Sequence, residues 1–75
     1  MTDFERLRAL IATILQVPEA EIEEATTRDD LAAWDSVQHL NLMLAIEDEY
    51  SVQLDVDELQ SLTNVRAILD FLAKQ

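Results

Sequence analysis

The chain of 75 residues contains no glycine, and its single proline is Pro18. Tight hairpin turns usually need glycine, and so do the loops that cradle phosphate groups in nucleotide-binding proteins. The sequence therefore disfavours a sheet-rich fold and excludes a glycine-rich phosphate loop. Hydrophobic residues make up 49% of the chain and aromatic residues only 5%, so Leu, Ile, Val and Ala must build the core. These are the usual materials of helical bundles, and we expect an all-α fold.

The spacing of apolar residues predicts three main helices and one short helix, at residues 3–15, 36–50, 56–60 and 64–73. Together they form a small bundle. The inner stripe of the first helix is Phe4, Leu7, Ile11 and Ile14, with Leu10 and Leu15 beside it. The last helix turns Val65, Ile68 and Leu72 inward. A chain of this length supports one domain, which we take as residues 1–75.

Each predicted helix is preceded by a residue that can cap its free N–H groups. Reciprocal caps, in which two residues three positions apart bond to each other's backbone, are expected for Thr2 with Glu5, Asp35 with Gln38 and Asp55 with Glu58. Thr63 is the expected cap of the last helix.

Residues 16–34 are predicted to form a long loop between the first two helices, because Pro18 ends the first helix and an acidic run follows. Loops of this length are unusual in a small domain and are often functional. The loop has room for a short helical turn. Its expected apolar anchors are Val17, Ile22, Leu31 and Trp34.

The charge of the chain limits its partners. Sixteen acidic and five basic residues give a net charge of −11, which argues against nucleic acids and anionic membranes as partners. Without cysteine, neither a disulfide nor a thiolate metal site can form. No signal-peptide pattern and no apolar stretch of membrane-spanning length is visible. We expect a monomeric cytoplasmic protein whose partners are proteins with basic patches.

The predicted helix at residues 36–50 is apolar on two sides. One face holds His39, Leu42, Met43, Ile46 and Tyr50, and a second stripe holds Val37, Leu40 and Leu44. Asn41, Glu47 and Asp48 flank the second stripe and give it an acidic rim. A domain this small has difficulty covering both faces. The second stripe is therefore expected to lie under the long loop, to be exposed for a partner, or to be divided between the two.

Ser36 stands where the loop meets this helix, so its hydroxyl is expected to face solvent at the electropositive helix start. The free N–H groups there would stabilise an attached phosphate or phosphodiester, although serine is also common at helix starts as a simple cap. His39, the only histidine, is most simply a hydrogen-bonded residue at the edge of the core. We predict no catalytic residue and no metal site, because a lone histidine with scattered carboxylates makes no zinc site.

The residues around Ser36 resemble the acyl and peptidyl carrier proteins. Asp35-Ser36-Val37 is similar to the Asp-Ser-Leu run that opens the second helix of these proteins. The acidic stretch that ends in an aromatic residue has its counterpart in residues 45–50, Ala-Ile-Glu-Asp-Glu-Tyr. The resemblance extends to Val17-Pro18 with Ile22 beyond it, and to Thr63-Asn64-Val65 at the last helix.

The resemblance implies a carrier protein that is not itself an enzyme. Ser36 would receive 4′-phosphopantetheine from coenzyme A through a separate phosphopantetheinyl transferase that uses Mg²⁺, with Asp35 flanking it as the helix cap. The thiol of the arm would carry an acyl or aminoacyl group as a thioester. Other implied partners are a ligase that loads the thiol and a downstream transferase or synthase. The expected docking residues are Val37, Gln38, Leu40, Asn41, Leu44, Glu47 and Asp48.

Departures from the fatty-acid carriers favour a specialised member. The glycine common before the serine is replaced by Ala33-Trp34, and Gln38 and Asn41 stand where acids are usual. A specialised aminoacyl or secondary-metabolite carrier is therefore preferred to a housekeeping fatty-acid carrier. One alternative is a small acidic docking module in which Ser36 only caps the helix. A hydrolase using Ser36 and His39 would lack an acid partner and an oxyanion site.

Overall fold

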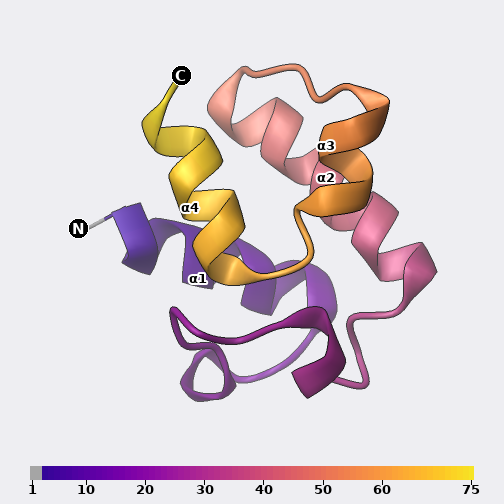
Figure 1. Cartoon of the computed structure of the whole chain (residues 1–75). Helices are drawn as coiled ribbons and strands as arrows, with labels where there is room; N and C mark the ends of the chain where they lie inside the picture. Colours follow the sequence, from indigo (N-terminus) through magenta and orange to yellow (C-terminus); the bar gives the residue numbers. More distant parts are fainter. Residues whose placement is uncertain (1–2) are drawn as a thin grey trace.

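The computed structural model describes residues 3–75, and over that range it contains four α-helices. They are α1 (Asp3–Leu15), α2 (Ser36–Tyr50), α3 (Val56–Ser61) and α4 (Val65–Ala73). Helix α1 packs against both α2 and α4 (Figure 1). The predicted all-α bundle of three main helices and one short helix is confirmed. No helix within residues 3–75 is long and apolar enough to cross a membrane.

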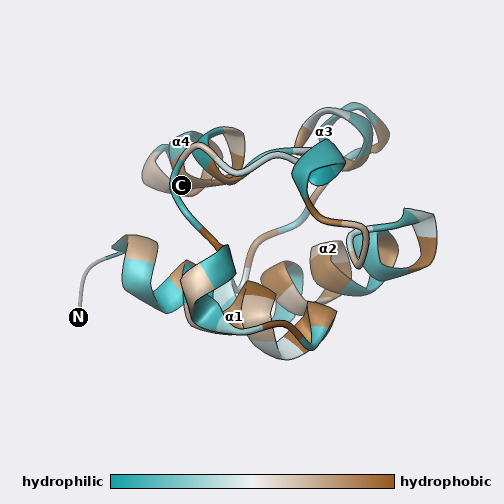
Figure 2. Ribbon diagram, turned by 90° about the horizontal axis from the view of Figure 1, so that it is seen from below, coloured by the Kyte–Doolittle hydropathy of each residue, from teal (hydrophilic) through white to brown (hydrophobic). Residues whose placement is uncertain are grey.

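The core gathers one apolar face from each main helix, and Figure 2 shows apolar and polar residues alternating along the ribbons. The predicted inner face of α2 is confirmed for His39, Leu42, Met43 and Ile46, which are buried, whereas Tyr50 is only partly buried against the core. Each fully buried Leu, Ile or Met side chain contributes roughly 1.5–3 kcal/mol. The buried apolar residues are Leu7, Ile11, Ala12, Leu15, Ile22, Trp34, Leu42, Met43, Ile46, Leu62, Val65 and Ile68.

Helix α1 buries a slightly different face from the predicted one. Leu7, Ile11 and Leu15 are buried, whereas Phe4 and Ile14 are only partly buried against the core. Leu7, Ile11 and Leu15 are four residues apart, and four residues advance by about 400° around the helix axis, roughly 40° more than a full turn. The buried stripe therefore winds slowly around α1 and ends at Leu15. The predicted cap at Thr2 lies outside the described residues.

The cap of α4 is Asn64, and the prediction of Thr63 was wrong. The Asn64 Oδ1 accepts a hydrogen bond from the Ala67 N–H at 2.8 Å. Thr63 instead contacts the long loop, where its carbonyl accepts from the Arg28 N–H at 2.8 Å. Helix α4 therefore starts one residue later than predicted.

Helix α3 begins with the predicted reciprocal cap. The Asp55 carboxylate accepts from the Glu58 N–H at 2.8 Å, and the Glu58 carboxylate accepts from the Asp55 N–H at 3.0 Å. The helix runs one residue further than predicted, to Ser61.

The segment between α1 and α2 is a loop with two 3₁₀ turns, at Glu19–Glu21 and Arg28–Asp30. Ile22 and Trp34 anchor it in the core, while Val17 and Leu31 are half-buried. An isolated antiparallel bridge between Thr27 and Asn64 ties it to the start of α4. In Figure 1 the segment runs in purple and magenta across one end of the bundle. The long loop is therefore fixed in place by hydrogen bonds and by burial.

The C-terminal end of α2 is held to α1 by Arg6. Its guanidinium lies 4.4 Å from the centre of the Tyr50 ring and donates to the Glu49 carbonyl at 3.1 Å. Burial raises the pKa of Tyr50, and the positive charge of Arg6 offsets part of that rise. Tyr50 therefore stays neutral at physiological pH and packs as an aromatic side chain.

Helices α1 and α2 both end at a residue in the left-handed region, without glycine. Gln16 has φ 58° and Ser51 has φ 54°. The N–H of the following residue reaches back to close the helix, from Val17 to the Ala12 carbonyl at 3.1 Å and from Val52 to Glu47 at 3.2 Å. Left-handed backbone costs a residue with a Cβ roughly 1–2 kcal/mol, so both helix ends carry strain.

We expect Ser51→Gly to raise the free energy of unfolding by about 0.5–1 kcal/mol, because glycine adopts a positive φ without that strain. Ser61→Gly is the matched control. Ser61 lies within α3, where glycine should instead lower stability by about 0.5–1 kcal/mol. Urea unfolding followed by circular dichroism measures both. Equal effects of the two substitutions would contradict the assignment of strain to Ser51.

Candidate functional site

Helix α2 is capped by Asp35, which leaves the Ser36 hydroxyl free of that task. The Asp35 Oδ1 accepts from the Gln38 N–H at 2.9 Å, and the Asp35 carbonyl accepts from the His39 N–H at 2.8 Å. The predicted return bond from the Gln38 side chain is not made, because its Oε1 accepts from Asn41 at 2.9 Å instead. Ser36 is the first residue of the helix and is exposed, as predicted.

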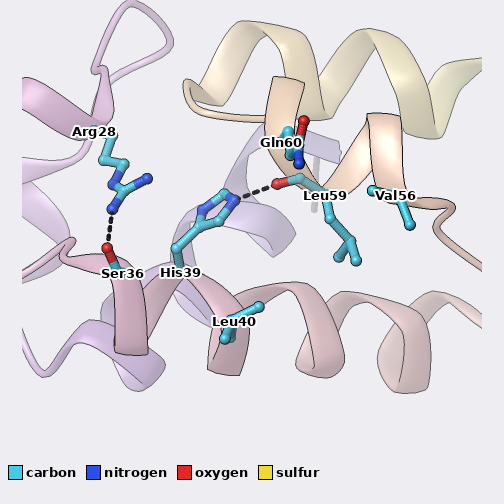
Figure 3. Close-up of a pocket in the computed structure, with 7 residues that line it drawn as sticks. All are labelled: Arg28, Ser36, His39, Leu40, Val56, Leu59 and Gln60. Atoms are coloured by element: carbon cyan, nitrogen blue, oxygen red, sulfur yellow. Dashed lines mark hydrogen bonds between the residues drawn. The ribbon is translucent and has the colours of Figure 1, made fainter.

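Arg28 reaches Ser36 from the long loop. Its Nη2 donates to the Ser36 Oγ at 2.8 Å, and its Nε donates to the Trp34 carbonyl at 3.2 Å (Figure 3). The sequence analysis did not identify Arg28 as a site residue. The available signal was its isolation, since it is the only lysine or arginine between positions 9 and 65. The structure thus puts a cation next to the serine in a strongly acidic chain.

His39 uses both ring nitrogens to join three parts of the fold. Trp34 Nε1 donates to His39 Nδ1 at 3.0 Å, and His39 Nε2 lies 2.6 Å from the Leu59 carbonyl of α3. Because Nδ1 accepts, the neutral ring carries its proton on Nε2 and donates it to Leu59. His39 is therefore a hydrogen-bonded residue at the edge of the core, as predicted, and has no free nitrogen to act as a base.

A surface groove opens beside Ser36, between α2 and α3 (Figure 3). It has a volume of about 420 Å³. Its lining combines polar groups at the serine end with apolar side chains further along. The lining residues are Arg28, Ser36, His39, Leu40, Val56, Leu59 and Gln60. Because Ser36 itself lines the groove, an extended group attached to it would have this partly apolar surface within reach.

The second apolar stripe of α2 is exposed, which resolves the two alternatives left by the sequence. The long loop packs elsewhere and leaves the stripe uncovered. Val56 of α3 extends the same apolar surface. We call these four residues the apolar strip, with exposed fractions of 68% for Val37, 56% for Leu40, 63% for Leu44 and 66% for Val56.

The rim of the strip differs in part from the prediction. Asp48 and Asn41 are exposed, as expected of rim residues. Glu47 is half-buried, and its Oε2 accepts from the Leu54 N–H at 2.8 Å, so this carboxylate fastens the α2–α3 connection. Within residues 3–75, no three His, Asp or Glu side chains gather in a way that could hold a metal ion.

Three comparisons with known proteins agree with one another. A family model described as "Phosphopantetheine attachment site" matches residues 5–72. The acyl carrier protein of Thermosynechococcus vestitus is 36% identical over 69 residues, which cover 91% of this chain and 84% of that protein. The solution structure of holo acyl carrier protein from Geobacter metallireducens superposes with a TM-score of 0.85 at 28% identity, covering 99% of this chain and 85% of that one.

His39→Leu should lower the free energy of unfolding by about 1–3 kcal/mol, because it leaves the buried Trp34 N–H without an acceptor. Urea unfolding followed by circular dichroism measures the loss. Asn41→Leu is the control, since Asn41 is exposed on the same helix and the change there should stay within about 0.5 kcal/mol. If His39→Leu unfolds at the urea concentration of the unaltered protein, the bridge contributes nothing to stability.

Proposed function

Because this chain belongs to the acyl carrier protein family, whose members carry a covalent phosphopantetheine arm and are not enzymes, we propose that Ser36 receives the arm. The observation that carries the proposal is an exposed hydroxyl at the first residue of α2, beside a guanidinium and an apolar groove. We take residues 1–75 as one carrier domain, supported by the family match over residues 5–72.

The residues at this site suit a phosphodiester. The Ser36 Oγ is accessible, and Arg28 already donates to it, so an anion bound there would meet a charged donor. In the transfer from coenzyme A, the Ser36 oxygen forms a bond to phosphorus, the phosphorus–oxygen bond to the nucleotide breaks, and adenosine bisphosphate leaves. The serine proton passes to a base of the transferase, because both nitrogens of His39 are already engaged.

When bound, the arm supplies a thiol that holds the carried group as a thioester. The chain's own contribution is to present this arm and to be recognised. Its partners are a phosphopantetheinyl transferase and acyl-handling enzymes, among which we include a ligase that loads the thiol and a downstream transferase or synthase. The apolar strip next to Ser36 is the surface that we assign to docking. Apolar anchors of this kind slow dissociation, and surrounding charges speed encounter.

The rival function is an acidic docking module in which Ser36 serves only as a helix cap. The observed cap argues against it, because the Asp35 carboxylate fills that role and the Ser36 hydroxyl accepts from Arg28 instead. A structural cap at Ser36 would need its oxygen to accept from a backbone N–H of the first turn.

We favour a specialised aminoacyl or secondary-metabolite carrier over a housekeeping fatty-acid carrier. The support comes from the first turns of α2, where Gln38 and Asn41 bond to each other beside Leu40 and present neutral amides. From Ser36 to Ile46 the helix has no acidic residue. A partner that recognises this end of the helix must therefore tolerate a neutral surface, unlike one that selects for carboxylates there.

Ser36→Ala should abolish the mass gain seen after incubation with coenzyme A, Mg²⁺ and a broad-specificity phosphopantetheinyl transferase. Intact-protein mass spectrometry measures the gain. Helicity should stay nearly unchanged, because Asp35 remains as the cap. Ser61→Ala is the matched control, an exposed serine on α3 whose loss should leave the mass gain intact. A mass gain on the Ser36→Ala variant, or none on the unaltered protein, would overturn the proposal.

The double variant Gln38→Asp with Asn41→Glu should make the neutral surface at the start of α2 acidic. We expect faster loading by fatty-acid enzymes and slower loading by the protein's own ligase, because charges at an interface alter encounter and partner choice. Paired measurements of kcat/KM on both enzymes test this, with circular dichroism to verify folding. If both values match those of the unaltered protein, the choice of partner depends on another surface.

A further inference from the structure

We propose that Arg28 holds the phosphodiester of the arm once Ser36 carries it, and so fixes the direction in which the arm leaves the protein. The inference rests on the proposed attachment at Ser36. It assigns to the loop residue Arg28 a role in positioning, through a direct contact with the attached group.

The side chain of Arg28 is already in place for this contact. Its Nε is fixed on the Trp34 carbonyl at 3.2 Å, and its Nη2 lies 2.8 Å from the Ser36 Oγ, the atom that would bond to phosphorus. The backbone N–H of Arg28 is also held, by the Thr63 carbonyl at 2.8 Å. A guanidinium has five N–H donors, so donors remain for phosphate oxygens next to Oγ. Because the side chain is fixed beforehand, binding the phosphate costs little further entropy.

The charge of Arg28 is not neutralised by a carboxylate. Three other arginines form ion pairs, Arg6 with Glu49, Arg8 with Glu19 and Arg66 with Glu24. Among residues 3–75, Arg28 has no such pair, and its guanidinium donates to a neutral carbonyl and a neutral hydroxyl. In a chain of net charge −11, an arginine next to the serine without an acidic partner is suited to an incoming anion.

The attached phosphodiester would be stabilised by such a cation. It would add a negative charge beside Asp35, whose carboxylate already accepts the Gln38 N–H and thereby occupies one donor of the helix start. The planar fork of Arg28 matches two phosphate oxygens, which an ammonium group does not. Arg28 and Ser36 lie together at one end of the groove, and Leu40 and Leu59 line it further along (Figure 3). A phosphate held by Arg28 would therefore sit at this polar end, and the rest of the arm would extend from there along the groove.

The test uses the full chain after loading with the arm and compares Arg28→Gln, Arg28→Lys and Arg66→Gln. Arg28→Gln removes the charge, Arg28→Lys keeps the charge without the fork, and Arg66→Gln is a control that removes one exposed guanidinium from α4. Mass spectrometry first establishes loading. The ³¹P chemical shift and transverse relaxation rate of the phosphodiester are then measured in folded protein. Urea-unfolded protein serves as the reference for a free arm.

We expect the unaltered protein and Arg66→Gln to share a ³¹P shift that differs from the unfolded reference. Arg28→Gln should move the shift most of the way to that reference and slow the relaxation, and Arg28→Lys should lie between. If Arg28→Gln is loaded and keeps the shift and relaxation of the unaltered protein, the positioning role is wrong while attachment at Ser36 stands. If the unaltered protein gains no mass, the proposed attachment fails and this inference fails with it.

A second measurement does not depend on loading of the variants. In the unaltered protein, the Nε–H resonance of Arg28 is recorded before and after the arm is attached, with Arg66 as the internal control. A change confined to Arg28 supports the contact with phosphate. Unchanged Arg28 resonances in fully loaded protein would overturn it.

Discussion

The imidazole of His39 is the contact on which the functional end of the molecule depends. Through Trp34 it fixes the end of the long loop, through its own backbone it belongs to α2, and through Leu59 it holds α3. The site at Ser36 uses all three parts, since Arg28 reaches the serine from the loop while α2 and α3 border the groove. An imidazole with both nitrogens hydrogen-bonded holds this arrangement in place, in keeping with a structural role for the histidine.

Sequence reasoning predicted the elements whose signals are local. The ranges of α1 and α2 follow from the 3.6-residue spacing, and the caps at Asp35 and Asp55 follow from short-range hydrogen bonding. Thr63 failed as a cap because a contact from the distant loop takes its carbonyl, and Asn64 supplies the cap instead. The burial of Leu15 in place of Ile14 likewise depends on where the neighbouring helices lie, which one helix cannot reveal.

The same division applies to the candidate site. Ser36 and the α2 part of the apolar strip could be predicted, because a helix start and a second apolar face are visible within one helix, whereas the addition of Val56 from α3 could not. Whether the loop would cover the strip could not, since that depends on the path of residues 16–34. Arg28 was missed for this reason as well, because no spacing rule links it to a serine eight residues away. Its isolation among acids was the one available hint.

The bridge between Thr27 and Asn64 joins two segments that leave the ribosome at different times. The loop is translated well before α4, yet the N–H of Arg28 is held by Thr63 and the carbonyl of Thr26 by Val65. A nascent chain that has exposed Ser36 therefore still lacks the two backbone contacts that tie the loop around Arg28 to the start of α4. A transferase that senses this local arrangement would distinguish finished copies of the protein from growing ones.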